Sequence, residues 1–274
     1  MKAPAMRRPA VAGRFYPAKP EVLSQQVDRY LASQDTAVVD GALGCVVPHA
    51  GYMYSGPVAG AVFQRLPARA TYLLLCPNHT GRGAPLAIAT SGEWLTPLGA
   101  VPIDSELAAD LCRSCRLLME DTRAHDNEHA IEVQLPFLQR RVGTFRFVPI
   151  ALGVGGLEAL ESLGRGIALT LKKREPVSVL IVASSDMNHY ESDEVTRRKD
   201  ALAIDQIKAL DPQGLYAVVR REDISMCGYG PAIAMLTAAK ELGATRADLI
   251  RYATSADAGG DRSAVVGYAG IIVS

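Results

Sequence analysis

The segment TYLLLCPNHTGRG, residues 71–83, decides the fold class of this chain. Thr71 to Cys76 is a continuous apolar run of strand length, without the polar alternation of a half-exposed strand. Such runs are typical of strands that are covered on both faces of a sheet. The run breaks into a glycine-rich turn that carries His79, so the segment predicts a buried strand followed by a polar loop.

Two other segments repeat this pattern of an apolar strand followed by a histidine. CVVPHAGYMYSG places His49 directly after a predicted strand at Leu43 to Val47. VLIVASSDMNHY places Asp186 and His189 directly after a predicted strand at Val177 to Ala183. The same polar feature therefore follows three predicted buried strands.

The remainder of the chain alternates short β-rich runs with longer segments of helical period. Further strands are predicted at Leu86 to Thr90, Phe145 to Leu152, Asp248 to Ala253 and Ala264 to Ile272. Helices are predicted at Pro57 to Leu66, Ser105 to Leu117, His129 to Val142, Gly156 to Lys173, Glu194 to Leu210 and Pro231 to Leu242. This alternation predicts an α/β protein, residues 1–274 as a single domain, with a central mixed and mostly buried sheet covered by helices.

Composition narrows the function classes. The chain has 274 residues, of which 49% are apolar and 21% charged, so it can bury a large core and is not disordered. Lys plus Arg and Asp plus Glu are 29 each, which gives no global charge to attract nucleic acid or an anionic membrane. The longest uncharged stretch, Gly41 to Phe63, contains Pro48 and Pro57 and predicts no membrane span.

The start of the chain lacks the apolar run of a signal peptide, and five scattered cysteines suggest reduced thiols. We therefore expect a cytoplasmic protein. The sequence also lacks the G-x-S-x-G pattern of serine hydrolases and the GxxxxGK[ST] phosphate loop.

The histidines indicate a metal site. In open α/β sheets, ligands bind beyond the carboxyl ends of the strands, so His49, His79 and His189 converge if their strands are neighbours. Asp186 lies three residues before His189 and either joins this site or caps a turn. Neutral imidazoles with one carboxylate or thiolate suit iron, copper or zinc.

The string HDNEH places His125 and His129 four residues apart at a predicted helix start. It fits the H-x-x-E-H pattern of inverted zinc peptidases, although nothing downstream resembles such an enzyme. We interpret His125 as a solvated residue at the helix start. His129 is interpreted as a site residue or as a group that orients a metal ligand.

Cysteines offer a third kind of ligand. Cys227 precedes a predicted helix, where a thiol has a lowered pKa, although an isolated cysteine is often just a small buried apolar residue. A carboxylate as third ligand favours non-haem Fe(II), whereas a Cys227 thiolate favours Cu(I) or Zn. Cys112 and Cys115 form C-x-x-C inside a predicted helix without a second pair, and we interpret them as structural.

Several motifs together resemble those of one family. They are RRPAVAGRFYP, VVPHAGYMYSGPVAG, LCPNHTGRG, EWLTPLGAVPID, NEHAIEVQLPFL, ASSDMNHY, MCGYGPAIAML and GDRSAVVGYAGI, in this order from about Arg8 to Val273. The chain is identified by them as a member of the Memo family, called AmmeMemoRadiSam system protein B in its prokaryotic form.

The resemblance implies a fold similar to class III, LigB-type extradiol dioxygenases, which use non-haem Fe(II). Carried over to this chain, it implies metal binding by His49, His79 and Cys227, with Fe(II) as the first choice of metal and copper or zinc as alternatives. The dioxygenases have a glutamate where this chain has Cys227. Proton transfer is implied for the motif that carries the candidate catalytic residues Asp186 and His189, to which we add His129. Tyr16 and Tyr54 are the implied substrate-binding residues.

Two functions follow from the resemblance. The first is a metal-dependent oxidoreductase that acts on a small, aromatic substrate. The second is a metal-binding or peptide-binding protein without turnover, which acts in a pathway with a radical-SAM protein and an AMMECR1-type protein.

Overall fold

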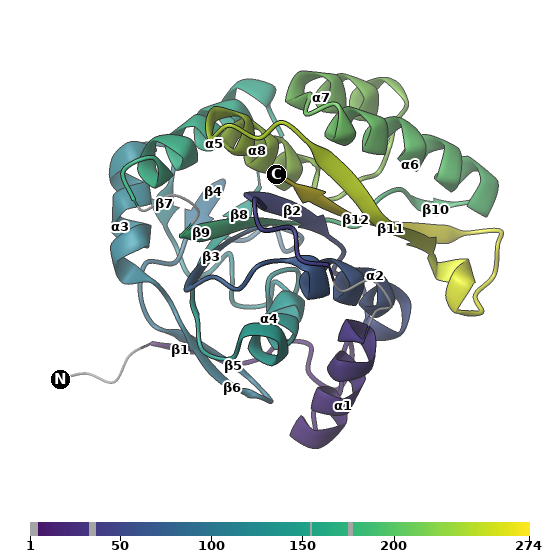
Figure 1. The fold of residues 1–274 in the computed structure, drawn as a ribbon, viewed down its shortest axis with the longest axis horizontal. Helices are drawn as coiled ribbons and strands as arrows, with labels where there is room; N and C mark the ends of the chain where they lie inside the picture. The colour runs from purple at the N-terminus through teal and green to yellow at the C-terminus, as the bar shows by residue number, and fades with distance from the viewer. Residues whose placement is uncertain (1–4, 33–36, 154, 175–177) are drawn as a thin grey trace.

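A computed structural model describes residues 5–32, 37–153, 155–174 and 178–274 (Figure 1). Its centre is a mixed sheet of nine strands. In order across the sheet these are β10 (His189–Glu191), β12 (Val265–Val273), β2 (Gly44–Val47), β9 (Val179–Ser184), β3 (Thr71–Pro77), β8 (Arg146–Leu152), β4 (Leu86–Ile88) and β7 (Met119–Glu120), with β11 (Ala247–Thr254) paired to β12. β2, β9, β3 and β8 are parallel, whereas β12 runs antiparallel to β2 and β4 runs antiparallel to β8.

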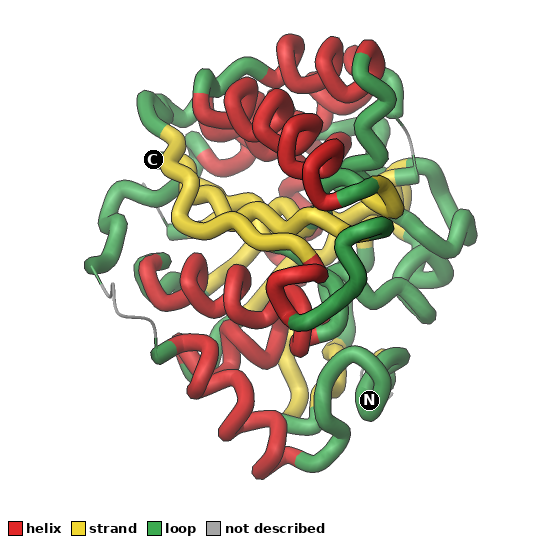
Figure 2. Tube along the Cα trace, turned by 90° about the vertical axis from the view of Figure 1, so that its right-hand side faces the viewer, coloured by secondary structure: helices red, strands yellow, loops and turns green. Residues whose placement is uncertain are grey.

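Helices cover both faces of this sheet, which Figure 2 shows as separate layers. One layer holds α3 (Ser105–Ser114), α5 (Leu157–Leu171), α6 (Asp193–Lys208), α7 (Pro212–Arg221) and α8 (Tyr229–Glu241). The other holds α1 (Pro20–Leu31), α2 (Tyr52–Arg65) and α4 (Leu135–Val142). Each layer forms its own apolar core, and strands β2, β3 and β9 are buried along their whole length. The predicted α/β class with a buried mixed sheet is confirmed.

A second, small sheet lies beside the α1 and α4 layer. It contains β1 (Met6–Arg7), β5 (Glu93–Thr96) and β6 (Gly99–Pro102). These strands are short and only partly buried, so they lack the long apolar runs that identify the central strands.

Some predicted boundaries are wrong. Pro57 does not begin α2, because the helix starts at Tyr52 and carries Pro57 inside it. His129 does not begin a helix, because a turn leads into a short 3₁₀ segment (Glu132–Gln134) before α4. Helices α1 and α7 were not predicted, although each has proline in its first turn, a position that proline favours. Val177, the predicted first residue of a strand, lies outside the described residues.

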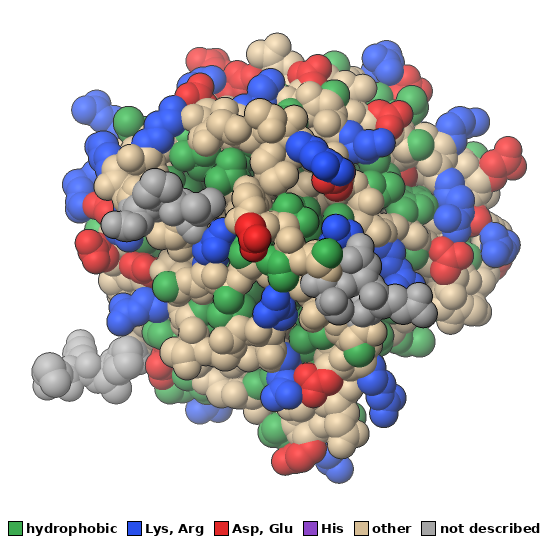
Figure 3. All heavy atoms as spheres, in the orientation of Figure 1, with side chains coloured by type: hydrophobic (Ala, Val, Ile, Leu, Met, Phe, Trp, Pro, Cys, Tyr) green, Lys and Arg blue, Asp and Glu red, His purple; other side chains and the backbone are tan. Residues whose placement is uncertain are grey.

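The cysteines are reduced and the surface charges are mixed, as the sequence predicts. All five cysteines are free. On the face shown in Figure 3, Lys and Arg side chains are interspersed with Asp and Glu. Among the described residues, none of the helices combines the length and apolar character needed to cross a bilayer.

Candidate metal centre

Three neighbouring parallel strands end at one edge of the sheet, and predicted site residues follow each of them. β2 and β3 both pair with β9, so their carboxyl ends lie side by side. His49 follows β2, His79 follows β3 and Asp186 follows β9. The Asp186 carboxylate accepts the backbone N–H of His49 at 2.8 Å, which joins two of these loops. The predicted convergence therefore occurs for His49 and His79, because their strands both pair with β9.

His129 completes a cluster of three imidazoles. Ring nitrogens of His49, His79 and His129 all lie within 4.8 Å of one another. The rings of His79 and His129 stack at 4.9 Å between centroids, and the ring of His49 meets both edge-on at 5.1 and 5.4 Å. Because one nitrogen of each ring lies this close to the others, the arrangement can hold a metal ion.

Burial keeps two of these rings neutral. It lowers the pKa of His49 to about 3 and the pKa of His129 to about 4. The Ser184 hydroxyl already donates to the Ala130 carbonyl, so it accepts from Nδ1 of His49 at 2.9 Å. This tautomer leaves a lone pair on Nε2 of His49, which is the form of histidine that binds metals.

Glu128 orients His79. Its carboxylate accepts the backbone N–H of His79 at 2.6 Å, the Nδ1–H of the same residue at 2.9 Å and the backbone N–H of Ala130 at 3.0 Å. Burial alone would raise the pKa of Glu128, but the hydrogen bond and charge of His79 outweigh it and lower the pKa to about 2. A carboxylate behind a histidine fixes the ring and leaves its other nitrogen free for a metal.

Cys227 reaches the cluster from the segment before α8. Its Sγ lies 3.2 Å from Nε2 of His49, the nitrogen whose lone pair is free. Burial, with a further contribution from the charge of Asp186, raises the pKa of this thiol. The predicted lowered pKa at the helix start is therefore wrong, because desolvation outweighs the helix terminus in the metal-free protein.

The donor set fits a metal. Neutral imidazoles and a thiol are ligands of iron, copper and zinc, and Glu128 supplies the orienting carboxylate that such sites have. The family model for Memo-like proteins matches residues 7–272. The chain belongs to the Memo family.

Similar proteins of known family come from archaea. The chain is 46% identical to a MEMO1 family protein of Methanosarcina barkeri over 98% of its own length and all of the relative's. A MEMO1 family protein of Methanopyrus kandleri is 44% identical over 97% of this chain and 98% of the relative. One from Methanothermobacter thermautotrophicus is 40% identical over 96% and 99%. The Memo match thus covers the whole candidate centre.

His189 lies outside the three-imidazole cluster but close enough to act electrostatically on His49, and Ser225 holds it. The Ser225 carbonyl accepts from Nδ1 of His189 at 3.0 Å, and its hydroxyl accepts the His189 backbone N–H at 2.8 Å. Since Nδ1 carries the proton, Nε2 is left as the basic nitrogen. Sequence reasoning did not find Ser225, because only the fold brings it to His189.

The two predicted substrate-binding tyrosines differ in exposure. Tyr54 is part-exposed near the start of α2. Tyr16 is buried, and its hydroxyl donates to Glu132 at 2.7 Å. Their substrate-binding roles stay predictions.

Glu132 binds the N-terminal segment to the loop that carries Glu128 and His129. It is fully buried and accepts from the backbone N–H groups of Ala10 and Val11 and from the guanidinium of Arg7 at 2.8 Å. Arg7 also donates at 2.6 Å to the backbone carbonyl of Glu128, the residue that orients His79. The sequence offered no local signal for this link, since its partners lie more than a hundred residues apart.

His125 is not the solvated residue that the sequence suggested. It is 2% exposed and packs its ring against Trp94, 5.6 Å away between centroids. Since the chain turns between His125 and His129 instead of forming a helix, the two rings do not share a face. The residues of the H-x-x-E-H pattern therefore do not form a joint site: of the two histidines only His129 joins the imidazole cluster, and Glu128 binds His79.

Asp200 contacts Asn188, the residue before His189, and makes the free energy of unfolding depend on pH. Its carboxylate accepts from the backbone N–H of Asn188 and from the hydroxyl of Tyr252, at 2.8 and 2.6 Å. Burial raises the pKa of Asp200 from 3.8 to about 7. Between about pH 4 and 7 the folded protein keeps a proton on Asp200 that the unfolded chain has released. The free energy of unfolding therefore falls as pH rises through this range.

We expect Asp200→Asn to flatten this part of the pH profile. The wild type should lose ~4 kcal/mol more unfolding free energy than the variant across that window, at about 1.4 kcal/mol for each pKa unit. Urea unfolding of both proteins at several pH values between 4 and 7.5 measures the difference. Parallel profiles would contradict the assignment to Asp200.

Proposed function

We propose that this protein is a metal-dependent oxidoreductase that uses iron at the His49, His79 and His129 cluster. The observation that carries the proposal is the set of three imidazoles whose nitrogens lie within 4.8 Å of one another, with the Cys227 sulfur beside them. Copper and zinc are the alternative metals, and a Cys227 thiolate in the ligand set would favour them.

The third ligand distinguishes two arrangements. His49 and His79 are common to both, and either Cys227 or His129 completes the set. The thiol next to His49 loses its proton when it binds a metal, whereas His129 is already neutral. The sequence resemblance favours Cys227, and the geometry of the imidazoles favours His129.

His189 and Asp186 have different roles in the proposed chemistry. A bound iron or copper would supply electron transfer to O₂ and polarise a ligand oxygen. His189, with Nδ1–H held by Ser225, keeps Nε2 as a base to take a proton from a substrate hydroxyl. Asp186 fixes the backbone of His49 and so aligns the loop after β2.

A binding role without turnover is the second candidate. Large apolar side chains that are exposed to solvent favour it. They are Met53 at 61% and Tyr54 at 38% near the start of α2, and Tyr190 at 79% within β10. Such side chains suit a peptide or a protein partner, which includes the proposed radical-SAM and AMMECR1-type pathway partners.

Oxygen uptake distinguishes the two functions. We expect the iron-loaded protein to consume O₂ with a set of catechols, and His189→Ala to reduce the rate at least ~100-fold because a general base contributes that much. Iron content, measured on the same samples, is the control and should be equal in both proteins. Equal rates would contradict the role of His189, and no uptake with any catechol would favour the binding role.

A further inference from the structure

Gln134 is a buried polar residue beside the imidazole cluster that the proposed chemistry does not use. It ends the short 3₁₀ segment before α4 and is 1% exposed. Its Nε2 lies 2.8 Å from the hydroxyl of Ser184 and 3.0 Å from the carbonyl of Pro48. Ser184 ends β9 and pairs with Val47, the last residue of β2. Gln134 therefore contacts both the residue before His49 and the strand end beside it.

The orientation of the Gln134 amide follows from its neighbours. The carbonyl of Pro48 and, at 3.4 Å, the carbonyl of Ala130 both face its Nε2. Only an N–H group can meet two carbonyl oxygens, so the amide oxygen has to lie on the other side. That oxygen has no hydrogen-bond partner within the described residues. The amide therefore acts on its surroundings as a donor.

The hydroxyl of Ser184 uses each of its hydrogen-bonding positions. It donates its hydrogen to the carbonyl of Ala130 at 2.7 Å, since a carbonyl can only accept. It accepts from Nε2 of Gln134, and its second lone pair is left for Nδ1 of His49 at 2.9 Å. Because the hydroxyl has no second hydrogen to give, Nδ1 of His49 has to carry the proton.

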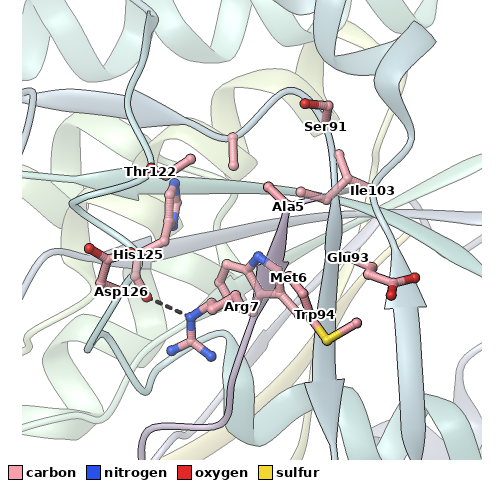
Figure 4. A pocket seen from close by; sticks show the side chains of 11 residues that line it. Ala5, Met6, Arg7, Ser91, Glu93, Trp94, Ile103, Thr122, His125 and Asp126 are labelled. Carbon is pink, nitrogen blue, oxygen red and sulfur yellow. Dashed lines mark hydrogen bonds between the residues drawn. The ribbon is translucent and has the colours of Figure 1, made fainter. Parts of the chain in front are cut away.

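The segment that carries this amide is itself held in place from outside. Near its beginning the guanidinium of Arg7 donates to the backbone carbonyl of His125 at 2.6 Å, which Figure 4 shows beside a pocket lined by both residues. Near its end the hydroxyl of Tyr52 donates to the carbonyl of Val133 at 2.6 Å. The amide therefore extends from a fixed backbone and can support another side chain.

We propose that Gln134 is a positioning residue for His49 and acts on it through Ser184. Its N–H group fills one lone pair of the hydroxyl and Ala130 takes the hydrogen, so the remaining lone pair stays directed at Nδ1 of His49. This relay keeps the imidazole in the tautomer whose Nε2 can bind a metal. The inference rests on the proposed metal-dependent function, but the tautomer of His49 in the metal-free protein tests it separately.

The ring nitrogens of His49 report the relay directly. A protonated and an unprotonated imidazole nitrogen differ widely in ¹⁵N chemical shift, and burial lowers the pKa of His49 to about 3, so the ring is neutral at neutral pH. We expect Nδ1 of the metal-free wild type to have the shift of a protonated nitrogen and Nε2 that of an unprotonated one. The variant His49→Ala identifies these signals, because they are missing from its spectrum.

Two variants interrupt the relay at different points. Ser184→Ala removes the acceptor of Nδ1–H, so both ring nitrogens should have intermediate shifts, as in a mixture of tautomers. Gln134→Met keeps the length of the side chain without its N–H groups and should change the shifts in the same direction, but less. Gln139→Met is the matched control, because Gln139 contacts Thr96 and Gly99 instead, and it should leave the shifts unchanged.

The affinity for Fe(II) is the second readout. We expect Gln134→Met to lower it ~10-fold and Ser184→Ala to lower it ~10–100-fold, the usual cost of losing a group that orients a metal ligand. Because Gln134 acts through Ser184, the double variant should bind Fe(II) within about twofold of Ser184→Ala alone. Anaerobic titration against a competing chelator measures these affinities, and urea unfolding shows whether each variant is folded.

Several results would overturn the inference. A proton on Nε2 of His49 in the wild type would contradict the relay itself. Wild-type shifts and affinity in Gln134→Met would show that Gln134 does not act on His49, and losses of affinity that multiply in the double variant would exclude a route through Ser184. Gln134→Leu replaces Gln134→Met if the latter does not fold. If even the wild type binds no Fe(II), the proposed function fails, whereas the shifts of the metal-free protein still decide the role of Gln134.

Discussion

Replacing His79 by alanine is expected to lower the affinity for Fe(II) more than ~100-fold. The loss of a group that merely orients a ligand costs ~10–100-fold, and the loss of the ligand itself costs more. The variant also removes the imidazole that Glu128 holds at 2.9 Å, and the remaining contact of Glu128 with Nδ1 of His129, at 3.4 Å, is longer. Anaerobic titration against a competing chelator measures the affinity, with iron content after gel filtration as a second readout.

Four further variants show whether the loss of iron affinity is specific to His79. Glu128→Gln keeps the shape but loses the charge behind His79, and should cost ~10–100-fold. His189→Ala should bind iron as the wild type does. Comparing His129→Ala with Cys227→Ser identifies the third ligand as the residue whose loss costs more. If His79→Ala retains wild-type affinity, the metal binds elsewhere.

The largest loss of stability is expected from Glu132→Ala. Glu132 is fully buried and Arg7 is 8% exposed at its side chain, so removing the carboxylate leaves a buried, unpaired guanidinium. Breaking a buried ion pair from one side costs ~3–5 kcal/mol. The variant also loses the acceptor for the backbone N–H groups of Ala10 and Val11. Urea unfolding at pH 7 measures the difference in free energy.

The Arg140 and Asp28 pair is the matched control. It has similar geometry, at 2.8 Å, but both side chains are more than 40% exposed. Asp28→Ala should therefore cost no more than ~1 kcal/mol. A comparable cost for Asp28→Ala and Glu132→Ala would show that burial of the Arg7 pair contributes nothing.

The central sheet and the position of the site were predictable from sequence because both depend on local patterns. A continuous apolar run such as Thr71 to Cys76 identifies a buried strand without knowledge of its neighbours. The residue after such a strand lies at the sheet edge where ligands bind, which is why His49, His79 and Asp186 were found.

The remainder depends on contacts that no local pattern encodes. His125 and His129 have the spacing of residues on one helical face, but the chain turns between them, and only His129 joins the imidazole cluster. The pKa of Cys227 depends on its desolvation and on the nearby charge of Asp186, which a sequence position before a helix does not reveal. Glu128 and Glu132 gain their roles from partners in distant segments.

The pairing of β2 joins segments that lie far apart in the chain. On one edge its residues pair with Val179–Ser184, and on the other with Val265–Val273. A folding intermediate in which β12 has not yet docked leaves one edge of β2 open, and open strand edges promote association between chains. The strand that leads to His49 is therefore protected from such association only after contacts of high sequence separation have formed.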